Sequence, residues 1–463
     1  MIPRLHRRQL RVQRVRGAAA LIVVLVLFFV VSLVAAYTSR GMIFEQRTSI
    51  NQLRSTQVLD IGDAGVEWAL TKLNAGLLGA ACDAAPGGAN TFRERYLVFA
   101  ADGTITGNAA ANPTCTFSEG GGWACSCPTA GSTIPGVAGG PTPAFRVYFG
   151  ADTTGARSNL IRVTVSACTD ASANCLANPQ VPDPGKGNVV VSASLGLKGA
   201  LDTIPAAAVT LPSASTGLAA LTLTGGARLA AYNGNPLGSG LAIHAGGTLP
   251  AAPDLTVGGA PGAPASTAIL QGDATLSADA GTGGLRNSSD AGACAAGDAN
   301  VGCSFNRAFT AFFGAPRAVY RNQPSLVRCA AGCDSAALAV LAARNPRSVI
   351  LVEGNATLDA NLGTAAAPVA LIVEGDVTIS GAGTVVTGFI YNTGTAGAAE
   401  AAWSVTGSPR IDGAIASELP ARMDGGGTLT VNYDLAALNK LRFEYGSFVR
   451  VPGGWRDFPS PTP

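Results

Sequence analysis

The chain has 463 residues, of which 47% are hydrophobic and only 13% are charged, with a formal net charge of +2. High apolar content with little net charge excludes an intrinsically disordered chain, and the length suffices for two or three domains. Residues 1–17 hold six arginines and no acid, so the remaining chain has 25 basic and 29 acidic residues, a net charge of −4. Such a body does not attract phosphate through its overall field, and no nucleic acid partner is expected.

The first predicted element is an apolar helix, because residues 18–39 carry no charge. At a rise of about 1.5 Å per residue this segment spans about 30 Å and can cross a bilayer. A secretory signal has a shorter apolar region, of roughly 7 to 15 residues. The arginines before the segment hold the amino terminus in the cytoplasm, so the body is expected on the other side of the membrane.

The helix is predicted to continue to about residue 75, because residues 43–73 contain no proline. Gly62 and Gly65 weaken it by about 1 kcal/mol each relative to alanine. One apolar face is expected to pack against a globular domain. Its predicted members recur at helical spacing: Ile50, Leu53, Ile61, Ala64 and Trp68.

The leader, the apolar span and the soluble half-helix together resemble a class III prepilin signal. More closely, RGAAALIVVLVLFFVVSLVAA followed by EQRTSINQLRSTQ and AGVEWAL resembles the amino-terminal region of PilX-type minor pilins of type IV pili. The resemblance implies that a prepilin peptidase cuts after Gly17 and that Ala18 becomes a methylated amino terminus. The segment VRVPGGWRDF at 449–458 also resembles the closing segment of large proteins in this group.

Ile22 departs from the major pilins, most of which have glutamate at the fifth mature position. In the family's accepted picture that carboxylate neutralises the terminal amine of a neighbouring subunit. An unpaired charge in apolar surroundings is costly, so such a glutamate is used where a partner exists. PilX-type minor pilins and the K-type pseudopilins of type II secretion share the absence and sit at or near a filament tip. Ile22 therefore indicates an initiating or tip-proximal subunit; the alternative is that it merely faces lipid.

The chain has ten cysteines, no CxxC motif and one histidine after the leader, a pattern that favours disulfides over zinc. Cys125 and Cys127 are too close to favour each other, so they are expected to take Cys82 and Cys115 in either order. Free buried thiols are the alternative for some of the ten. Three further pairs would each close a short loop: Cys168 with Cys175, Cys294 with Cys303, and Cys329 with Cys333.

The expected fold is α+β, with an antiparallel pilin-like sheet packed on the long helix and a large β-rich domain beyond it. Strands are predicted at 145–150, 160–167 and 188–197. The predicted divisions are a leader at 1–17, the long helix at 18–75, a disulfide-containing pilin-like domain at 76–204, a β-rich repeat-like domain at 205–433, and a final helix with strands at 434–463.

The β-rich region contains similar turns, QGDATLS at 271, EGNATLD at 353 and EGDVTIS at 374. The last two lie 21 residues apart, as stacked rungs of a β-helix or solenoid would. An irregular β-sandwich is the alternative. Helices are expected at 305–314, 334–345 and 434–441.

Candidate chemical groups are few. His244 lies in an alternating strand, where an exposed or satisfied side chain is expected rather than a catalyst. Glu353 and Glu374 match in repeat phase, as do Asp273 and Asp376. Acids that stack in this way are expected to be solvated residues of turns. The alternatives are a calcium site at Glu353, Glu374 and Asp376, or the acid pair of a glycosidase. No enzyme activity and no cofactor are expected.

The sequence therefore predicts a minor pilin that primes pilus assembly or sits at the tip and presents a β-rich domain for adhesion. Its expected partners are other major and minor pilins, the prepilin peptidase, the assembly machinery of the bacterial inner membrane, and a host or surface ligand. The body would lie in the periplasm before assembly and on the cell surface afterwards. The alternatives are a K-type pseudopilin and a membrane-anchored carbohydrate-active β-helix protein.

Overall fold

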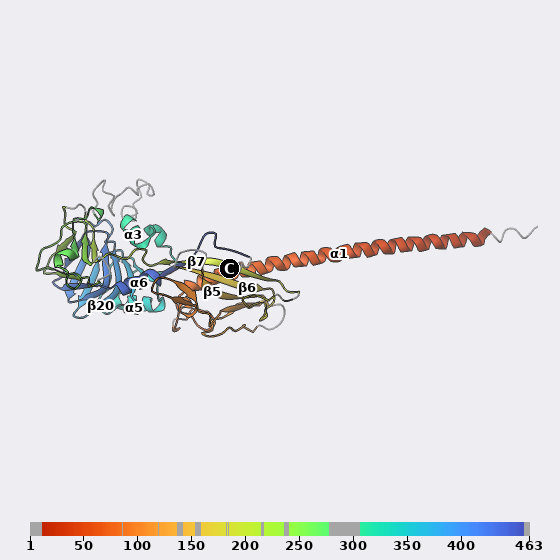
Figure 1. Cartoon of the computed structure of the whole chain (residues 1–463), viewed down its shortest axis with the longest axis horizontal. Helices are drawn as coiled ribbons and strands as arrows, with labels where there is room; N and C mark the ends of the chain where they lie inside the picture. The colour runs from red at the N-terminus through yellow and green to blue at the C-terminus, as the bar shows by residue number, and fades with distance from the viewer. Residues whose placement is uncertain are drawn as a thin grey trace, which may run out of the picture.

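The computed structural model describes residues 12–85, 87–118, 120–136, 142–152, 159–181, 183, 185–213, 217–235, 240–276 and 306–457. The fold is mixed α+β, as expected. Figure 1 shows one long helix projecting from a β-rich body, with an antiparallel sheet around the embedded end of the helix and a second β-rich region farther away. The predicted pair of Cys294 and Cys303, and most of the predicted leader, lie outside the described residues.

The long helix α1 (Val12–Leu73) is continuous over 62 residues, which confirms the prediction from the absence of proline. The face it buries matches the predicted one in part. Ile61 and Trp68 are partly buried against the core of the antiparallel part, as predicted. Ile50, Leu53 and Ala64 are exposed, because burial of apolar side chains begins at Val58 and Ala64 lies on the other side of the helix. The buried members of α1 are Val58, Val66, Ala69 and Leu73.

Gly62 and Gly65 lie where α1 touches the sheet. A Cβ atom at Gly62 would come within 2.6 Å of Cγ2 of Val191, and one at Gly65 within 2.6 Å of Cγ1 of Val165. The two glycines therefore let the helix approach the sheet more closely than any other residue would allow. Their cost in helix propensity is accompanied by a packing role that the sequence did not reveal.

The antiparallel sheet has six strands in the order β25-β7-β6-β5-β3-β4. The three predicted strands are confirmed as β5, β6 and β7, each antiparallel to the next. A small antiparallel pair of β1 and β2 lies nearby. The elements are β1 (Leu97–Phe99), β2 (Ile105–Gly107), β3 (Thr114–Ser118), β4 (Gly122–Ser126), β5 (Ala144–Ala151), β6 (Leu160–Cys168), β7 (Asn188–Gly199), β25 (Gly446–Arg450) and helix α2 (Phe92–Tyr96).

The second β-rich region is built from two parallel sheets, which we call the parallel stack. The larger sheet follows the order β12-β10-β24-β22-β20-β18-β16-β14, with β8, β11 and β13 joined at its side. The smaller follows β15-β17-β19-β21-β23-β9. Val349 pairs with Ala370, and Ala356 with Val377, so the 21-residue repeat of the sequence is also the register between neighbouring strands.

The chain alternates between the two sheets from residue 326 to 433, and apolar side chains from both fill the space between them. The strands of the larger sheet are β8 (Ala207–Leu211), β10 (Arg228–Tyr232), β11 (Leu241–Ala245), β12 (Leu255–Gly258), β13 (Ile269–Leu270), β14 (Leu326–Cys329), β16 (Val349–Val352), β18 (Val369–Val373), β20 (Val385–Asn392), β22 (Arg410–Ser417) and β24 (Thr428–Tyr433). Those of the smaller are β9 (Leu221–Leu223), β15 (Cys333–Asp334), β17 (Ala356–Leu358), β19 (Val377–Gly381), β21 (Ala401–Gly407) and β23 (Ala421–Asp424).

The three helices expected in this part are present as α3 (Asn306–Phe313), α5 (Ser335–Arg344) and α6 (Leu435–Phe443). Together with α4 (Arg317–Tyr320), helices α3 and α6 cover the outer face of the larger sheet with an apolar cluster rich in aromatic rings. Short 3₁₀ turns occur at Ala265–Ala268 and Ala274–Leu276.

One repeat prediction is wrong. The QGDATLS turn at 271 follows β13, which pairs with β11 and not with the strands that carry the other two copies. Asp273 and Asp376 therefore do not stack. The Gly-Asp turn is suited to the start of many strands, so the motif alone does not define a position in the stack.

The two ends of the parallel stack have different neighbours. Near β14 the main chain of Leu77 donates to Arg344 over 3.4 Å, and the hydroxyls of Ser325 and Ser447 lie 2.6 Å apart. That end is fixed to the antiparallel part. The end formed by β10 and β12 lies farthest from α1 (Figure 1).

Candidate assembly site on the N-terminal helix

The first candidate site is the projecting half of α1. Among the described residues, α1 is long and apolar enough to cross a membrane, and none of its most apolar window is buried in the chain. Ile22 is 62% exposed, and the large apolar residues from Leu21 to Phe44 are all exposed. This uncovered apolar surface needs lipid or other apolar helices as its surroundings. Gly17 and Ala18 lie within α1, and cleavage between them stays a prediction.

The embedded end of α1 is held by polar contacts with α2 and with β25. The side chain of Asn74 donates to the carbonyl of Phe448 over 2.9 Å and accepts from its N–H over 2.8 Å. The buried guanidinium of Arg93 donates to the carbonyls of Leu73 (2.9 Å) and Gly446 (3.0 Å). Carbonyls left over at a helix end are thus satisfied by groups that also bind β25.

The C-terminal segment completes this attachment. Residues 454–456 continue beyond β25 along β7, with paired main-chain bonds of 2.7 and 2.8 Å between Ser192 and Arg456. Trp455 donates from Nε1 to Asp63 over 2.8 Å, and Arg450 lies 2.6 Å from Glu67. The described part of the 449–458 segment, residues 449–457, therefore joins the sheet edge to α1 and fixes the direction of the helix relative to the body.

Four disulfides lie within the part of the chain that the structure describes, and they reinforce the body. Cys168 bonds to Cys175 and Cys329 to Cys333, the pairs expected from their spacing. The sequence allowed two pairings of the first four cysteines. The structure pairs Cys82 with Cys127 and Cys115 with Cys125. No free cysteine occurs among the described residues.

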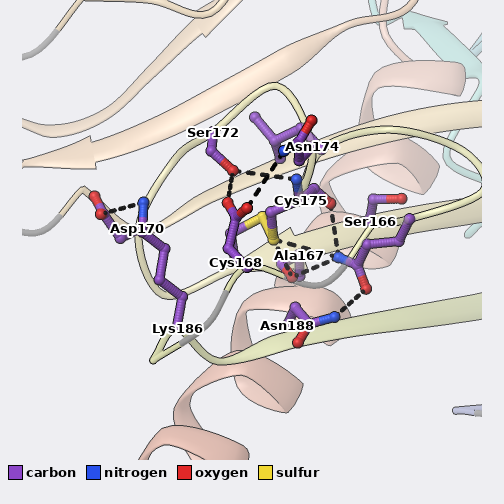
Figure 2. Close-up of a disulfide and its surroundings, with 12 residues drawn as sticks. Ser166, Ala167, Cys168, Asp170, Ser172, Asn174, Cys175, Lys186 and Asn188 are labelled. Carbon is purple, nitrogen blue, oxygen red and sulfur yellow. Dashed lines mark hydrogen bonds and ion pairs between the residues drawn. A yellow bond between two sulfur atoms is a disulfide. The ribbon is translucent and has the colours of Figure 1, made fainter.

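The loop closed by Cys168 and Cys175 lies near α1 (Figure 2). Ser172 donates to Asp183 and accepts from the N–H of Cys175, and Lys186 lies 2.8 Å from Asp170. The hydrogen bond from Lys186 lowers the pKa of Asp170 below its usual range. The loop is thus held by polar contacts as well as by its disulfide.

The repeat-phased acids of the parallel stack meet arginines. Arg321 lies 3.1 Å from Glu353 and 3.3 Å from Glu374, and Arg328 lies 3.3 Å from Glu353. Asp376 accepts a hydrogen bond of 2.9 Å from Thr395. No three His, Cys, Asp or Glu side chains gather as metal ligands in the part of the chain that the structure describes. One guanidinium thus contacts both glutamates of the calcium alternative, which stays a hypothesis.

His244 has a carboxylate partner. Its Nε2 lies 2.6 Å from Oδ2 of Asp273, and Thr275 donates to the other oxygen of that carboxylate. Burial alone would raise the pKa of Asp273, but hydrogen bonds from His244 and Thr275 lower it below its ordinary value. This agrees with the expectation of a satisfied histidine.

The sequence did not predict a buried ion pair in the parallel stack. Arg317, at the start of α4, contacts the fully buried Glu418, which also accepts a 2.9 Å hydrogen bond from Tyr391. Burial raises the pKa of Glu418 although the Arg317 charge opposes it. The pair joins residues 101 positions apart and ties α4 to the larger sheet, a contact for which the sequence carries no local signal.

Comparison with known families bears on α1. The PilX N-terminal family model matches residues 16–67, which covers the exposed apolar half of α1 and the first turns that pack on the sheet. No curated protein and no solved structure matches the chain. The family match and the uncovered apolar helix together support a PilX-like N-terminal region of the type found in type IV pilins.

Proposed function

We propose that this chain is a minor pilin that helps to start assembly of a type IV pilus and occupies a position at or near its tip. The observation that carries the proposal is the match of residues 16–67 to the PilX N-terminal family on a helix whose apolar half is bare. That half has no cover within the described chain, and sister helices would bury it. The expected partners are other major and minor pilins and the inner-membrane assembly machinery.

The tip position is supported by two features. Ile22 leaves no carboxylate at the fifth mature position to neutralise the amine of a preceding subunit. The parallel stack also extends the body away from the free end of α1 (Figure 1). In a bundle of helices anchored in one membrane, that end points away from the cell, and a bulky extension is accommodated most easily where no further subunit follows.

We also propose that the parallel stack is a β-helix-like solenoid. Support comes from the parallel pairing of every second strand, because the chain alternates between the two sheets, and from a 21-residue register where the repeat is clearest. A β-sandwich would instead be expected to contain antiparallel pairs. The solenoid would present its outer faces for adhesion.

We expect the chain to mature as the resemblance to prepilins implies. A prepilin peptidase would cut after Gly17, and Ala18 would become the methylated amino terminus. The disulfide-bonded body would fold in the periplasm and then be carried to the cell surface on the pilus.

A K-type pseudopilin is the second candidate, because it also lacks the glutamate at the position of Ile22. Resemblance to that group would imply a large helical insertion, whereas the described middle of this chain is mainly β. A carbohydrate-active enzyme using Glu353 and Glu374 is less well supported, since Arg321 pairs with both carboxylates. We therefore propose a structural and adhesive role without catalysis.

The test is deletion of the gene followed by electron microscopy of surface pili, with twitching and attachment assays. We expect few or no pili, restored by the full-length gene. Mass spectrometry of the protein from sheared pili should give methylated Ala18 as the first residue. Normal piliation, together with an intact Met1 terminus in cells that make pili, would refute the proposal. A secretion defect with normal pili would favour the pseudopilin.

A further inference from the structure

The end of the parallel stack farthest from α1 carries a polar face, which we call the distal face. It is formed by the outward side chains of the parallel neighbours β12, β10, β24 and β22. Side chains alternate along a strand, so Leu229, Leu429 and Ile411 point into the core while their neighbours point outward. The outward members are Thr256, Gly258, Arg228, Ala230, Tyr232, Thr428, Thr430, Asn432, Arg410 and Asp412.

Tyr232 is the aromatic residue of this face and is 38% exposed. Its cross-strand neighbour on β12 is Gly258. A Cβ atom at Gly258 would lie 2.6 Å from Cδ1 and 3.1 Å from Cε1 of the tyrosine. The ring therefore lies against β12 in the space that a side chain at Gly258 would fill, and it remains partly exposed. A large ring held flat at the surface offers an apolar platform at little cost in conformational entropy.

Polar side chains lie beside Tyr232 on the two neighbouring strands, β24 and β22. Asn432 is its neighbour on β24, and Asp412 is the neighbour of Asn432 on β22. Asn432 donates from Nδ2 to Oδ1 of Asp412 over 3.0 Å, and Arg410 donates to Oδ2 over 2.9 Å. Two strand spacings separate Tyr232 from Asp412, about 10 Å. The carboxylate thus fixes both neighbouring side chains in orientation.

These contacts leave functional groups directed outward. Within the described part of the chain, Asn432 uses its NH₂ group on Asp412, so its carbonyl oxygen is left as an acceptor. Arg410 uses one terminal nitrogen, so its other N–H groups are left as donors. An acceptor and a donor side by side, next to an apolar ring, match a ligand with adjacent hydroxyls and an apolar face.

The charge of the distal face is balanced. Arg410 pairs with Asp412, and Arg228 lies 3.8 Å from Asp254. A face without net charge does not select anionic ligands over neutral ones. A single aromatic among polar groups also differs from the apolar core of a protein interface.

We propose that the distal face binds a neutral oligosaccharide. A sugar ring stacks on Tyr232, one hydroxyl donates to the carbonyl oxygen of Asn432, and an adjacent hydroxyl accepts from Arg410. The inference deepens the proposed function and rests on it, since only a surface-presented stack would bring this face to a glycan. It names the ligand class and the residues that contact it.

The test uses the purified full-length chain in detergent on a printed array of neutral and acidic oligosaccharides, followed by titration of the best neutral ligand. Tyr232→Ala and Asn432→Ala should each weaken binding at least tenfold, and Tyr232→Phe should retain it. Thr378→Ala, on the smaller sheet, is the matched control and should bind as the unmodified chain does. Melting curves establish that each variant is folded.

Binding to acidic glycans alone, no binding to any glycan, or unchanged affinity of folded Tyr232→Ala would each overturn the inference. Cells that carry Tyr232→Ala should make normal pili but attach less well to surfaces displaying the ligand. A deletion strain with normal pili would instead refute the proposed assembly role, whatever the array shows. The two failures are therefore distinguishable.

Discussion

The two β regions of this molecule differ in how far apart in the sequence their paired strands lie. In the antiparallel part, β7 pairs with β25, so Gly199 lies opposite Gly446 at the far end of the chain. In the parallel stack, most neighbouring strands follow one another closely in sequence, as Val349 and Ala370 do. The stack departs from this at its distal end, where Arg228 pairs with Thr428. The part that holds the helix thus depends on the whole chain, while most of the stack is made from local repeats.

This difference separates two tasks. The antiparallel part fixes α1 through its embedded turns, the C-terminal segment and the contacts of Asn74 and Arg93. The described elements that pack most closely on α1, namely β5, β6, β7, β25 and α2, all belong to the antiparallel part. We therefore expect changes in the stack to leave the attachment of the helix intact, and changes at the helix–sheet contact to leave the stack folded.

The largest expected effect comes from Trp403→Ala. Trp403 is 1% exposed in the core of the stack. Loss of such a ring costs about 3–5 kcal/mol of unfolding free energy. Denaturant unfolding followed by circular dichroism should show an early transition of the stack. The remaining tryptophans, Trp68, Trp123 and Trp455, all belong to the antiparallel part, so fluorescence of this variant should report a later transition there.

Trp455→Ala is the matched control for that experiment. Trp455 is 41% exposed and makes one hydrogen bond with Asp63, so its loss should cost about 1 kcal/mol. If fluorescence and circular dichroism shift together in Trp403→Ala, the two regions unfold as one unit and the separation is wrong.

The next effect is expected from Gly65→Val at the helix–sheet contact. The added atoms would meet Val165 and the ring of Phe145, 2.6 and 3.1 Å from the position of a Cβ atom. Overpacking of this kind costs about 1–3 kcal/mol. Tryptophan fluorescence should show earlier unfolding of the antiparallel part, with the stack unchanged.

Gly41→Ala tests the opposite prediction for a glycine with open surroundings. Nothing lies within 4 Å of a Cβ atom there, so only helix propensity changes, by about 1 kcal/mol in favour of the helix. Equal effects of the two substitutions would show that Gly65 has no packing role.

The sequence predicted the helix and only part of its buried face. A continuous helix follows from the absence of proline at 43–73, and that prediction is confirmed. Apolar spacing correctly predicts that Ile61 and Trp68 pack on the body, but it also places the exposed Leu53 and Ala64 on that face. The closest approach is made instead by Gly62 and Gly65, which have no side chain to count. Apolar periodicity cannot detect a contact made by backbone.

Predictions from the repeats and from the cysteine spacing were also correct only in part. EGNATLD and EGDVTIS gave the correct register because both the turn and the following strand recur, whereas QGDATLS at 271 shares only the turn. Short loops indicated the pair of Cys168 and Cys175, but either order of the first four cysteines satisfied the spacing. The buried pair of Arg317 and Glu418 required the fold itself.

Acid should weaken the connection between the two regions. Glu94 of the antiparallel part lies 3.2 Å from Arg347, which begins the turn into β16. Burial alone would raise the pKa of Glu94, but hydrogen bonds from Thr91 and the charge of Arg347 lower it below its ordinary value of 4.5. A carboxyl with a lowered folded pKa contributes stability that is present above its ordinary value and lost as the pH falls through the folded pKa.

Hydrogen exchange at α2 and around Arg347 should therefore increase as the pH is lowered below 4.5, after correction for the intrinsic exchange rate. Glu94→Gln should remove much of this pH dependence. Glu67→Gln, which alters an exposed pair with Arg450, should leave it in place. The same acid response in Glu94→Gln would show that other carboxylates control this connection.

The smallest effect is expected where Arg321 bridges the stacked glutamates. Its ion pairs are partly exposed, and such pairs contribute about 1 kcal/mol or less, with further loss in salt. Arg321→Ala should lower stability slightly and leave Glu353 and Glu374 as like charges on neighbouring turns. Calcium should then raise the melting temperature of Arg321→Ala, and do so less in Arg328→Ala, where the bridge remains. Equal stabilisation of the unmodified chain would mean that the guanidinium does not occupy the place of a cation, which would reopen the calcium interpretation of these acids.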